Sequence, residues 1–291
     1  TQDDGAAGSS GNVFALTTVA PIYPLYIRDE KGNIMYNSTA GIQSYDYGDG
    51  TVNGIIRPYI QQANPLCSNQ LDTNESEGNS VNAIGFAEVR FLKDFKFTST
   101  NSVSSEETRY TNTTNPWFGQ YASQNGAITV EHERTWSYNY QQLLTWHHQF
   151  DLHEVDAMLG HEYYRRRYYV LYGDKTNMYT FPSNDLASAV NTGSTNSYRN
   201  DYNTEGWFGR VQYNYDQKYF ASMSYRRDAS SRFAPENRWG NFWSFGGAWL
   251  ISKEKFFNVA WIDELKIKAS YGEQGNDNIQ DQYGMDQFLY E

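Results

Sequence analysis

Apolar and polar side chains alternate along two neighbouring segments of the second half of the chain. In Trp207–Tyr215 the odd positions carry Trp, Gly, Val and Tyr, and the even positions after Phe208 carry Arg, Gln and Asn. After Asp216-Gln217-Lys218 the alternation resumes over Tyr219–Arg227. A period of two residues is typical of a strand with one apolar face. Two such segments joined by three polar residues predict a β-hairpin.

The same pattern predicts eight strands between residues 81 and 291. The other six are expected at Ala83–Leu92, Phe95–Ser104, Thr135–Phe150, His153–Leu171, Asn241–Ser252 and Leu265–Tyr271. The connections alternate in length, with tight turns at Lys93-Asp94, Asp151-Leu152 and Asp216–Lys218, and long polar loops at Ser105–Gly126 and Gly173–Tyr202. Short turns on one side and long loops on the other are typical of an outer-membrane β-barrel.

Strand length and aromatic placement also favour a transmembrane barrel. A strand of about ten residues rises about 33 Å. Tilted by about 45° it spans about 23 Å, close to the apolar band of about 25 Å in such barrels. Tyr213, Tyr215 and Tyr219 flank a turn, where rings with a polar edge suit a membrane interface. A soluble β-sandwich also supplies one apolar face per strand and remains the alternative.

Residues 1–80 show little alternation and are rich in turn-forming residues. Prolines and glycines recur throughout this region, for example at Pro21, Pro24, Gly48 and Gly50. We predict a long extracellular loop region over residues 1–80, followed by transmembrane strands and loops over residues 81–291. An irregular stretch of this length is unusual unless it has a function.

Composition excludes several classes of protein. Aromatic residues make up 17% of the 291 residues and the formal net charge is −11. The aromatic content argues against disorder, and the acidic balance argues against nucleic-acid binding. Cys67 is the single cysteine, which excludes a disulfide-rich scaffold. The sequence contains no run of 18 apolar residues and does not begin with a signal segment, so the chain is expected to be an internal piece of a longer protein.

Four segments of the chain carry motifs that occur together in one known family. Two of them are GRVQYNYDQKYFASMSYRRDASSRFAPENRWG at Gly209–Gly240 and LKIKASYGEQGNDN at Leu265–Asn278. The others are APIYPLYIRDEKGNIMY and FDLHEVDAMLGHEYY, which lie upstream. Together they resemble the SusC/RagA-type TonB-dependent transporters of the Gram-negative outer membrane. The likeness is dense over Gly209–Asn278, with one departure at Ala229, where the family commonly has glycine.

The resemblance implies a parent protein that imports oligomeric nutrients, either glycans or peptides. It implies a barrel of about 22 strands, of which this chain supplies about eight. It also implies a plug domain and a TonB-contacting segment, both absent from this chain, and a SusD-like surface lipoprotein that acts as a lid. Outer-membrane lipid, TonB and the nutrient are the other expected partners.

Two sets of residues are candidates for contact with a nutrient or lid. Tyr23, Tyr26, Trp117 and Phe118 lie in predicted external loops, where aromatic rings either stack on a ligand or partner or pack within the loop. The polar face of the strands is expected to line the lumen through Arg210, Gln212, Asn214, Lys266 and Lys268.

Three charged clusters have structural interpretations. His147, His148, His153 and His161 surround one hairpin with Glu154 and Glu162, but the spacing of a helical zinc motif is absent. We therefore predict lumen or interface histidines, no metal site and no cofactor. In Arg165-Arg166-Arg167 two arginines are expected to face the lumen and one the interface, although an anionic ligand or lipid headgroup is the alternative. Arg226, Arg227, Asp228, Arg232, Glu236 and Arg238 are expected to hold the strand ends and a loop together by charged hydrogen bonds.

Transport is the leading functional hypothesis, and catalysis finds no support. The sequence has neither a nucleophile motif nor a phosphate-binding glycine loop, so we do not expect an enzyme. The rival hypotheses are a soluble extracellular carbohydrate-binding or adhesive β-sandwich, and a small closed barrel that acts as an enzyme or anchor.

Overall fold

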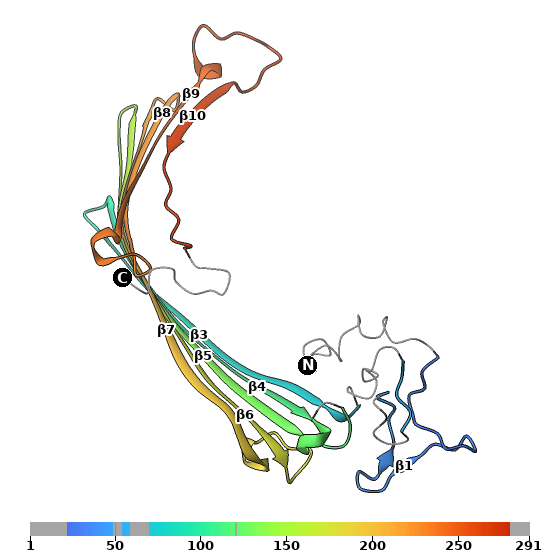
Figure 1. Ribbon diagram of the computed structural model, residues 1–291. Coiled ribbons are helices and arrows are strands. Elements are labelled where there is room, and N and C mark those ends of the chain that lie inside the picture. The colour runs from blue at the N-terminus through green and yellow to red at the C-terminus, as the bar shows by residue number, and fades with distance from the viewer. Residues whose placement is uncertain (1–21, 49, 51–53, 59–69, 120, 280–291) are drawn as a thin grey trace. The chain divides into compact units, whose positions relative to one another are not determined.

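The computed structural model of the chain describes residues 22–48, 50, 54–58, 70–119 and 121–279 (Figure 1). Cys67 and the first residues of the predicted loop region lie outside these ranges. The strands are β1 (Tyr36–Asn37), β2 (Ile42–Gln43), β3 (Thr73–Phe91), β4 (Phe95–Thr114), β5 (Ala127–Phe150), β6 (His153–Met178), β7 (Ala189–Tyr215), β8 (Tyr219–Ser230), β9 (Trp239–Leu250) and β10 (Lys266–Gly272). Short 3-10 turns occur at Ala122–Gln124, Leu186–Ser188, Pro235–Asn237 and Ile251–Lys253.

The eight predicted strands form one antiparallel sheet. Its order is β10-β9-β8-β7-β6-β5-β4-β3, so every strand pairs with its neighbour in sequence. The edges are β3 and β10, which do not pair with each other within the described residues. The sheet is therefore a section of barrel wall, and neither a two-sheet sandwich nor a closed eight-stranded barrel is present in the part of the chain that the structure describes.

Several strands are longer than the sequence pattern predicts. β4 continues to Thr114, β6 continues to Met178 and β7 begins at Ala189. The first part of the loop predicted at Ser105–Gly126 and most of the loop predicted at Gly173–Tyr202 are therefore strand. These extensions are rich in Ser, Thr and Asn and lack alternation. A strand with polar residues on both faces keeps its backbone hydrogen bonds but loses the two-residue period, so pattern alone assigns it to a loop.

The predicted tight turns are confirmed between the strands. Asp216 and Gln217 both have positive φ, at 50° and 51°, and Lys218 N–H donates to Tyr215 O at 2.9 Å. Two consecutive left-handed residues are the geometry of a two-residue hairpin turn whose twist matches that of the strands. Leu92 and Lys93, with φ of 47° and 63°, are the two left-handed residues of the turn between β3 and β4.

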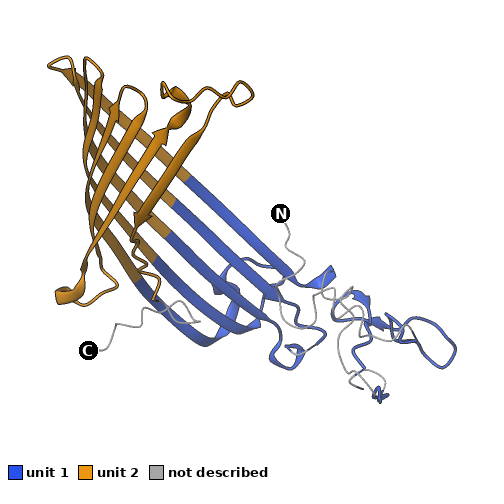
Figure 2. Cartoon of the chain, turned by 90° about the horizontal axis from the view of Figure 1, so that it is seen from above, with its two compact units in different colours: residues 1–80, 106–134, 169–199 blue, residues 81–105, 135–168, 200–291 orange. Residues whose placement is uncertain are grey.

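The chain divides into two compact units, which Figure 2 colours blue and orange. Unit 1 comprises residues 1–80, 106–134 and 169–199, and unit 2 comprises residues 81–105, 135–168 and 200–291. The division falls within strands β3 to β7. Among the described residues, no helix has the length and apolar character needed to cross a membrane.

Two small apolar cores lie in unit 1. Tyr45, Tyr47 and Phe118 form one, and Ile128, Met178 and Ala189 form the other. Among the described residues, the single buried apolar residue of unit 2 is Ala234. A section of barrel wall is one sheet thick, so its two faces meet lipid and lumen instead of a packed second layer.

Candidate functional site on the polar face

The strand register gives unit 2 two chemically different faces. Val211 pairs with Met223, and Met223 pairs with Phe245 across β7, β8 and β9. One residue further along β7, Gln212 pairs with Ser222, and Ser222 with Gly246. The alternation predicted from sequence is therefore in phase from strand to strand, and it separates an apolar face from a polar face.

The apolar face is exposed to a degree that a water-soluble surface would not tolerate. Val211 and Met223 are each 49% exposed, and Ile267 is 57% exposed. Contiguous exposed apolar surface of this kind marks contact with a partner or a membrane. In a β-sheet whose strands alternate between an apolar and a polar face, such an exposed apolar face is the lipid-facing surface of a barrel.

Two rows of aromatic rings cross this apolar face. The first runs beside the short turns, with His153 and Tyr215 ring centroids 4.9 Å apart and Tyr219 and Trp249 centroids 6.3 Å apart. The second includes Trp207, whose ring lies 4.2 Å from that of His161. Eight residues separate Trp207 from Tyr215 along β7, which is about 27 Å of strand. At a tilt of about 45° the two rows lie about 19 Å apart along the membrane normal, as expected for the two aromatic girdles of a barrel.

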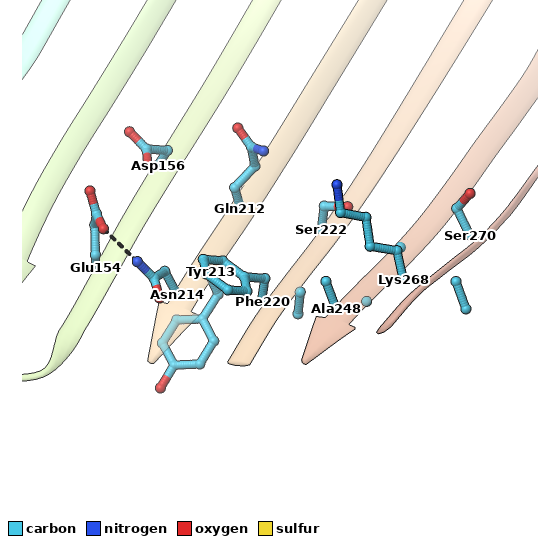
Figure 3. A pocket seen from close by; sticks show the side chains of 14 residues that line it. Glu154, Asp156, Gln212, Tyr213, Asn214, Phe220, Ser222, Ala248, Lys268 and Ser270 are labelled. Atoms are coloured by element: carbon cyan, nitrogen blue, oxygen red, sulfur yellow. Dashed lines mark hydrogen bonds between the residues drawn. The ribbon is translucent and has the colours of Figure 1, made fainter. Parts of the chain in front are cut away.

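The polar face contains a hollow of about 470 Å³, shown in Figure 3. Glu154 and Asp156 enter it from β6, and Gln212 and Asn214 enter it from β7. Asn214 Nδ2 donates to Glu154 Oε2 at 2.8 Å. On the far side the hollow is lined by small and polar residues of β8 to β10, namely Ser222, Gly246, Ala248, Lys268 and Ser270. Small side chains opposite polar ones leave room for hydrated ligand atoms.

A second hollow of about 460 Å³ adjoins the same side chains. Asp156 and Gln212 line both hollows, and His147 and Arg210 line only this second one. Lys266 is the first residue of β10, and its Nζ is 4.1 Å from the centre of the Phe220 ring. The five predicted lumen residues thus share the polar face, and their contact with a passing solute remains a prediction.

The four aromatic residues predicted to contact a ligand or lid all have partners within unit 1. Phe118 is 4% exposed, and its ring packs edge-on to Tyr45 at 5.6 Å. Tyr26 lies 5.0 Å from Tyr45, and Trp117 packs edge-on to Phe181 at 5.2 Å. The Tyr23 ring lies 4.5 Å from the guanidinium of Arg57. Packing within the loops is therefore present at each residue, and a role in ligand or lid contact remains a prediction.

Asn115 fixes the loop that carries two of these rings. It is fully buried, and its Oδ1 accepts from the backbone N–H groups of Trp117 and Phe118 at 3.1 and 2.8 Å. Its Nδ2 donates to Asp72 Oδ1 at 2.8 Å, and its own N–H donates to the same oxygen at 2.9 Å. Burial raises the pKa of the Asp72 carboxyl, and the two hydrogen bonds from Asn115 only partly oppose this shift.

The structure assigns each predicted histidine to a face. His147 lies in the polar hollow, whereas His153 Nδ1 is 2.6 Å from the hydroxyl of Tyr213 on the apolar face. His161 lies on the apolar face against Trp207, and His148 stacks on Trp146 at 5.8 Å. This distribution agrees with the interpretation as lumen and interface histidines.

The expectation that two of the three consecutive arginines face the lumen was wrong. Arg165 and Arg167 both pair with Asp201, at 3.6 and 3.0 Å. Alternation places them on the same face as His161, which is the apolar one, and leaves Arg166 on the polar face. The partners of His153 and His161 on β7 set this phase, and sequence alone does not supply them.

The charged cluster around β8 connects strands and loop as predicted. Arg226 Nε donates to Asp228 Oδ1 at 2.6 Å, and Arg226 Nη2 donates to Glu162 Oε2 at 3.3 Å. In the segment after β10, Asp277 accepts from the hydroxyls of Tyr202 and Ser230 at 2.5 and 2.8 Å. Burial alone would raise the pKa of the Asp277 carboxyl, but these hydrogen bonds, together with the charge of Arg232, lower it overall. The participation of Asp277 was not predicted from sequence.

Comparisons with known proteins give consistent matches. The chain is 29% identical over 258 residues to TonB-dependent receptor SusC of Bacteroides thetaiotaomicron, covering 85% of the chain and 24% of that protein. It is 27% identical over 219 residues to TonB-dependent receptor P3 of Formosa agariphila, covering 74% of the chain and 22% of that protein. No family model matches the chain.

Solved structures share the fold. The RagAB peptide transporter superimposes with a TM-score of 0.70 at 21% identity, covering 89% of this chain and 27% of that one. The RagAB peptide importer in its open-open state gives 0.67 at 22% identity, covering 84% and 26%. The chain spans about a quarter of the length of the curated relatives that it matches.

Proposed function

We propose that the chain, which is similar to SusC/RagA-type TonB-dependent receptors of the outer membrane, forms lumen wall in an importer of oligomeric nutrients, glycans or peptides. The observation that carries the proposal is the in-phase separation of an apolar and a polar face across β7 to β10. A wall with lipid on one side and hydrated solute on the other requires this separation. The names of the relatives support energy-coupled uptake, because they are TonB-dependent receptors.

The proposal also places the parts of the chain. Of residues 1–80, predicted as an extracellular loop region, residues 73–80 already belong to strand β3. The proposal therefore assigns the residues before β3 to the extracellular loop region, and β3 to β10 with their connections to the barrel wall. A SusD-like lipoprotein covers the extracellular side, where Tyr23, Tyr26, Trp117 and Phe118 are the candidate contacts. TonB acts through a plug that lies elsewhere in the full protein.

Growth on defined nutrients tests the import function. A strain that lacks the full-length parent protein is compared with the wild type, and with a strain that lacks TonB, on oligosaccharide and peptide mixtures as sole carbon sources. The proposal predicts that both mutants lose growth on one class of oligomer and retain growth on its monomers. Undiminished growth of the parent-deficient strain on every oligomer would argue against import.

The polar face is tested by removing charge from its far edge. Lys266→Gln with Lys268→Gln leaves hydrogen-bonding groups in place but removes two amines from the wall beside the 470 Å³ hollow. We expect slower uptake of the nutrient at unchanged surface expression. Lys253→Gln with Lys255→Gln, beside the short turn after β9, is the matched control. Equal uptake by both double variants for all nutrients would restrict Lys266 and Lys268 to a structural role.

A further inference from the structure

We propose that His147, Glu154 and Asp156 form a binding site for a divalent transition-metal ion such as Zn²⁺ on the polar face of unit 2. His147 lies on β5, and the two carboxylates lie on β6, just after the turn at Asp151-Leu152. One ligand atom from each residue lies within 4.8 Å of the other two. The sequence did not predict this site because its spacing is that of a hairpin and not of a helical motif.

The geometry fits an ion between the two strands. His147 Nδ1 lies 2.8 Å from Asp156 Oδ1. Two ligands that each bind Zn²⁺ at about 2.1 Å lie about 3.0–3.4 Å apart, so this pair needs little movement to accept an ion. Glu154 lies two residues before Asp156 on the same strand, so its carboxylate projects to the same side, as Figure 3 shows. A rotation of the longer Glu154 side chain brings one of its carboxylate oxygens into the coordination shell of the same ion.

The charge balance favours a cation. Neither Glu154 nor Asp156 has an ion pair with a lysine or arginine within the described ranges; Glu154 is bound by the neutral amide of Asn214, and Asp156 by His147. Two carboxylates this close repel each other, and a bound cation offsets that repulsion. An imidazole next to two carboxylates is a donor set that suits zinc and similar transition metals.

The surroundings supply the rest of a coordination site. Asp156 lines both polar hollows, so water can complete the coordination shell and an ion can enter from the lumen side. Asn214 Nδ2 holds Glu154 Oε2 at 2.8 Å. Such outer contacts orient a ligating carboxylate and affect affinity about 10- to 100-fold. Asn214 is therefore a positioning residue for this site.

The chain offers a matched control for the experiment. His148 Nδ1 lies 2.8 Å from Asp94 Oδ2, the same kind of pair at the same distance, but no third ligand joins it among the described residues. The full-length parent protein is purified in detergent, freed of metal with a chelator and titrated with Zn²⁺. Bound zinc is measured by mass spectrometry after dialysis, and Co²⁺ absorption reports the ligand set. Thermal unfolding of each metal-free variant checks that the barrel is intact.

The result expected is one zinc ion fewer per barrel, or affinity at least tenfold weaker, for His147→Gln, Glu154→Gln and Asp156→Asn, each of which keeps side-chain length. Asn214→Ala is expected to weaken binding about tenfold, whereas His148→Gln keeps the wild-type value. Equal zinc binding by wild type and the three ligand variants would overturn the proposal. A loss in His148→Gln as large as that in His147→Gln would overturn it too.

Discussion

Strand β7 passes through two regions that have the same backbone and different chemistry. In unit 2, residues 207–215 alternate between an apolar and a polar face. In unit 1, residues 190–199 are exposed at every position and show no alternation. Both stretches are strand. The comparison teaches that the two-residue period reports a difference between the media on the two faces and not the presence of a strand.

Strand β4 repeats the contrast. Residues 95–105 belong to unit 2, and residues 106–114 continue the same strand in unit 1 with a run of Glu, Thr, Arg, Tyr and Asn. Backbone hydrogen bonds to neighbouring strands hold both halves, because each N–H and C=O still finds a partner. We therefore expect the two halves to respond differently to changes in side chain.

The largest expected effect comes from a charge on the apolar face. Val211 lies midway along β7 between the aromatic residues Trp207 and Tyr215, so Val211→Lys places an amine near the centre of the membrane. We expect the full-length protein to lose about 2–4 kcal/mol in free energy of unfolding, measured by urea denaturation in lipid vesicles. Ser197→Lys, on the unit 1 half of the same strand, is expected to change it by less than about 0.5 kcal/mol.

Equal losses for the two lysine variants would contradict the division of β7 into a lipid-facing half and a solvated half. A loss for Ser197→Lys alone would reverse that division.

A smaller effect is expected inside unit 1, where stability comes from buried hydrogen bonds. Asn115→Ala removes the acceptor of two backbone N–H groups and leaves the buried Asp72 carboxyl with fewer donors. We expect a local cost of about 1–3 kcal/mol, seen as faster amide exchange at Trp117 and Phe118. Asn112→Ala, at a half-buried position of β4, is the control, and equal exchange in the two variants would show that Asn115 does not hold the loop.

The smallest expected effect is a dependence on pH from Asp72. Burial raises the pKa of this carboxyl above its ordinary value of 3.8, so the folded state binds the proton more tightly than the unfolded state. Its contribution to stability is therefore fully present below the unfolded pKa, and it is lost as pH rises through the folded pKa. Asp72→Asn is expected to remove this loss of stability with rising pH. The urea midpoints of wild type and variant are compared at about pH 3.5 and at about pH 7. A difference between the two proteins that is the same at both pH values would contradict the prediction.

The sequence predicts the fold well wherever the two faces of the sheet differ in polarity. All eight strands of the sheet, the tight turns and the phase of Trp207–Tyr215 follow from alternation and turn residues. For the extensions of β4, β6 and β7 the sequence pattern predicts loops, because their side chains are polar on both faces. Pairing with neighbouring strands determines that those residues form strands. A local sequence pattern does not contain information about that pairing.

The candidate site was predictable only in part. Arg210, Gln212 and Asn214 follow from alternation on one strand. The meeting of His147 with Asp156 requires the pairing of β5 with β6, although the two residues stand symmetrically about Asp151-Leu152. The phase of Arg165 and Arg167 depends on the partners of β6 along β7. This part of the site depends on the pairing between strands, which the sequence pattern of a single strand does not show.

Spin-label accessibility along β7 tests the central claim, a wall with a lipid face and a lumen face, most directly. In a Cys67→Ser background of the full-length protein in lipid vesicles, single nitroxide labels are placed at residues 207–214 and 190–199. Collisions with oxygen, which concentrates in lipid, are compared with collisions with a water-soluble nickel chelate. The account predicts a ratio that is high at odd positions and low at even positions over 207–214, and uniformly low over 190–199. A flat ratio over 207–214, or the opposite phase, would contradict it.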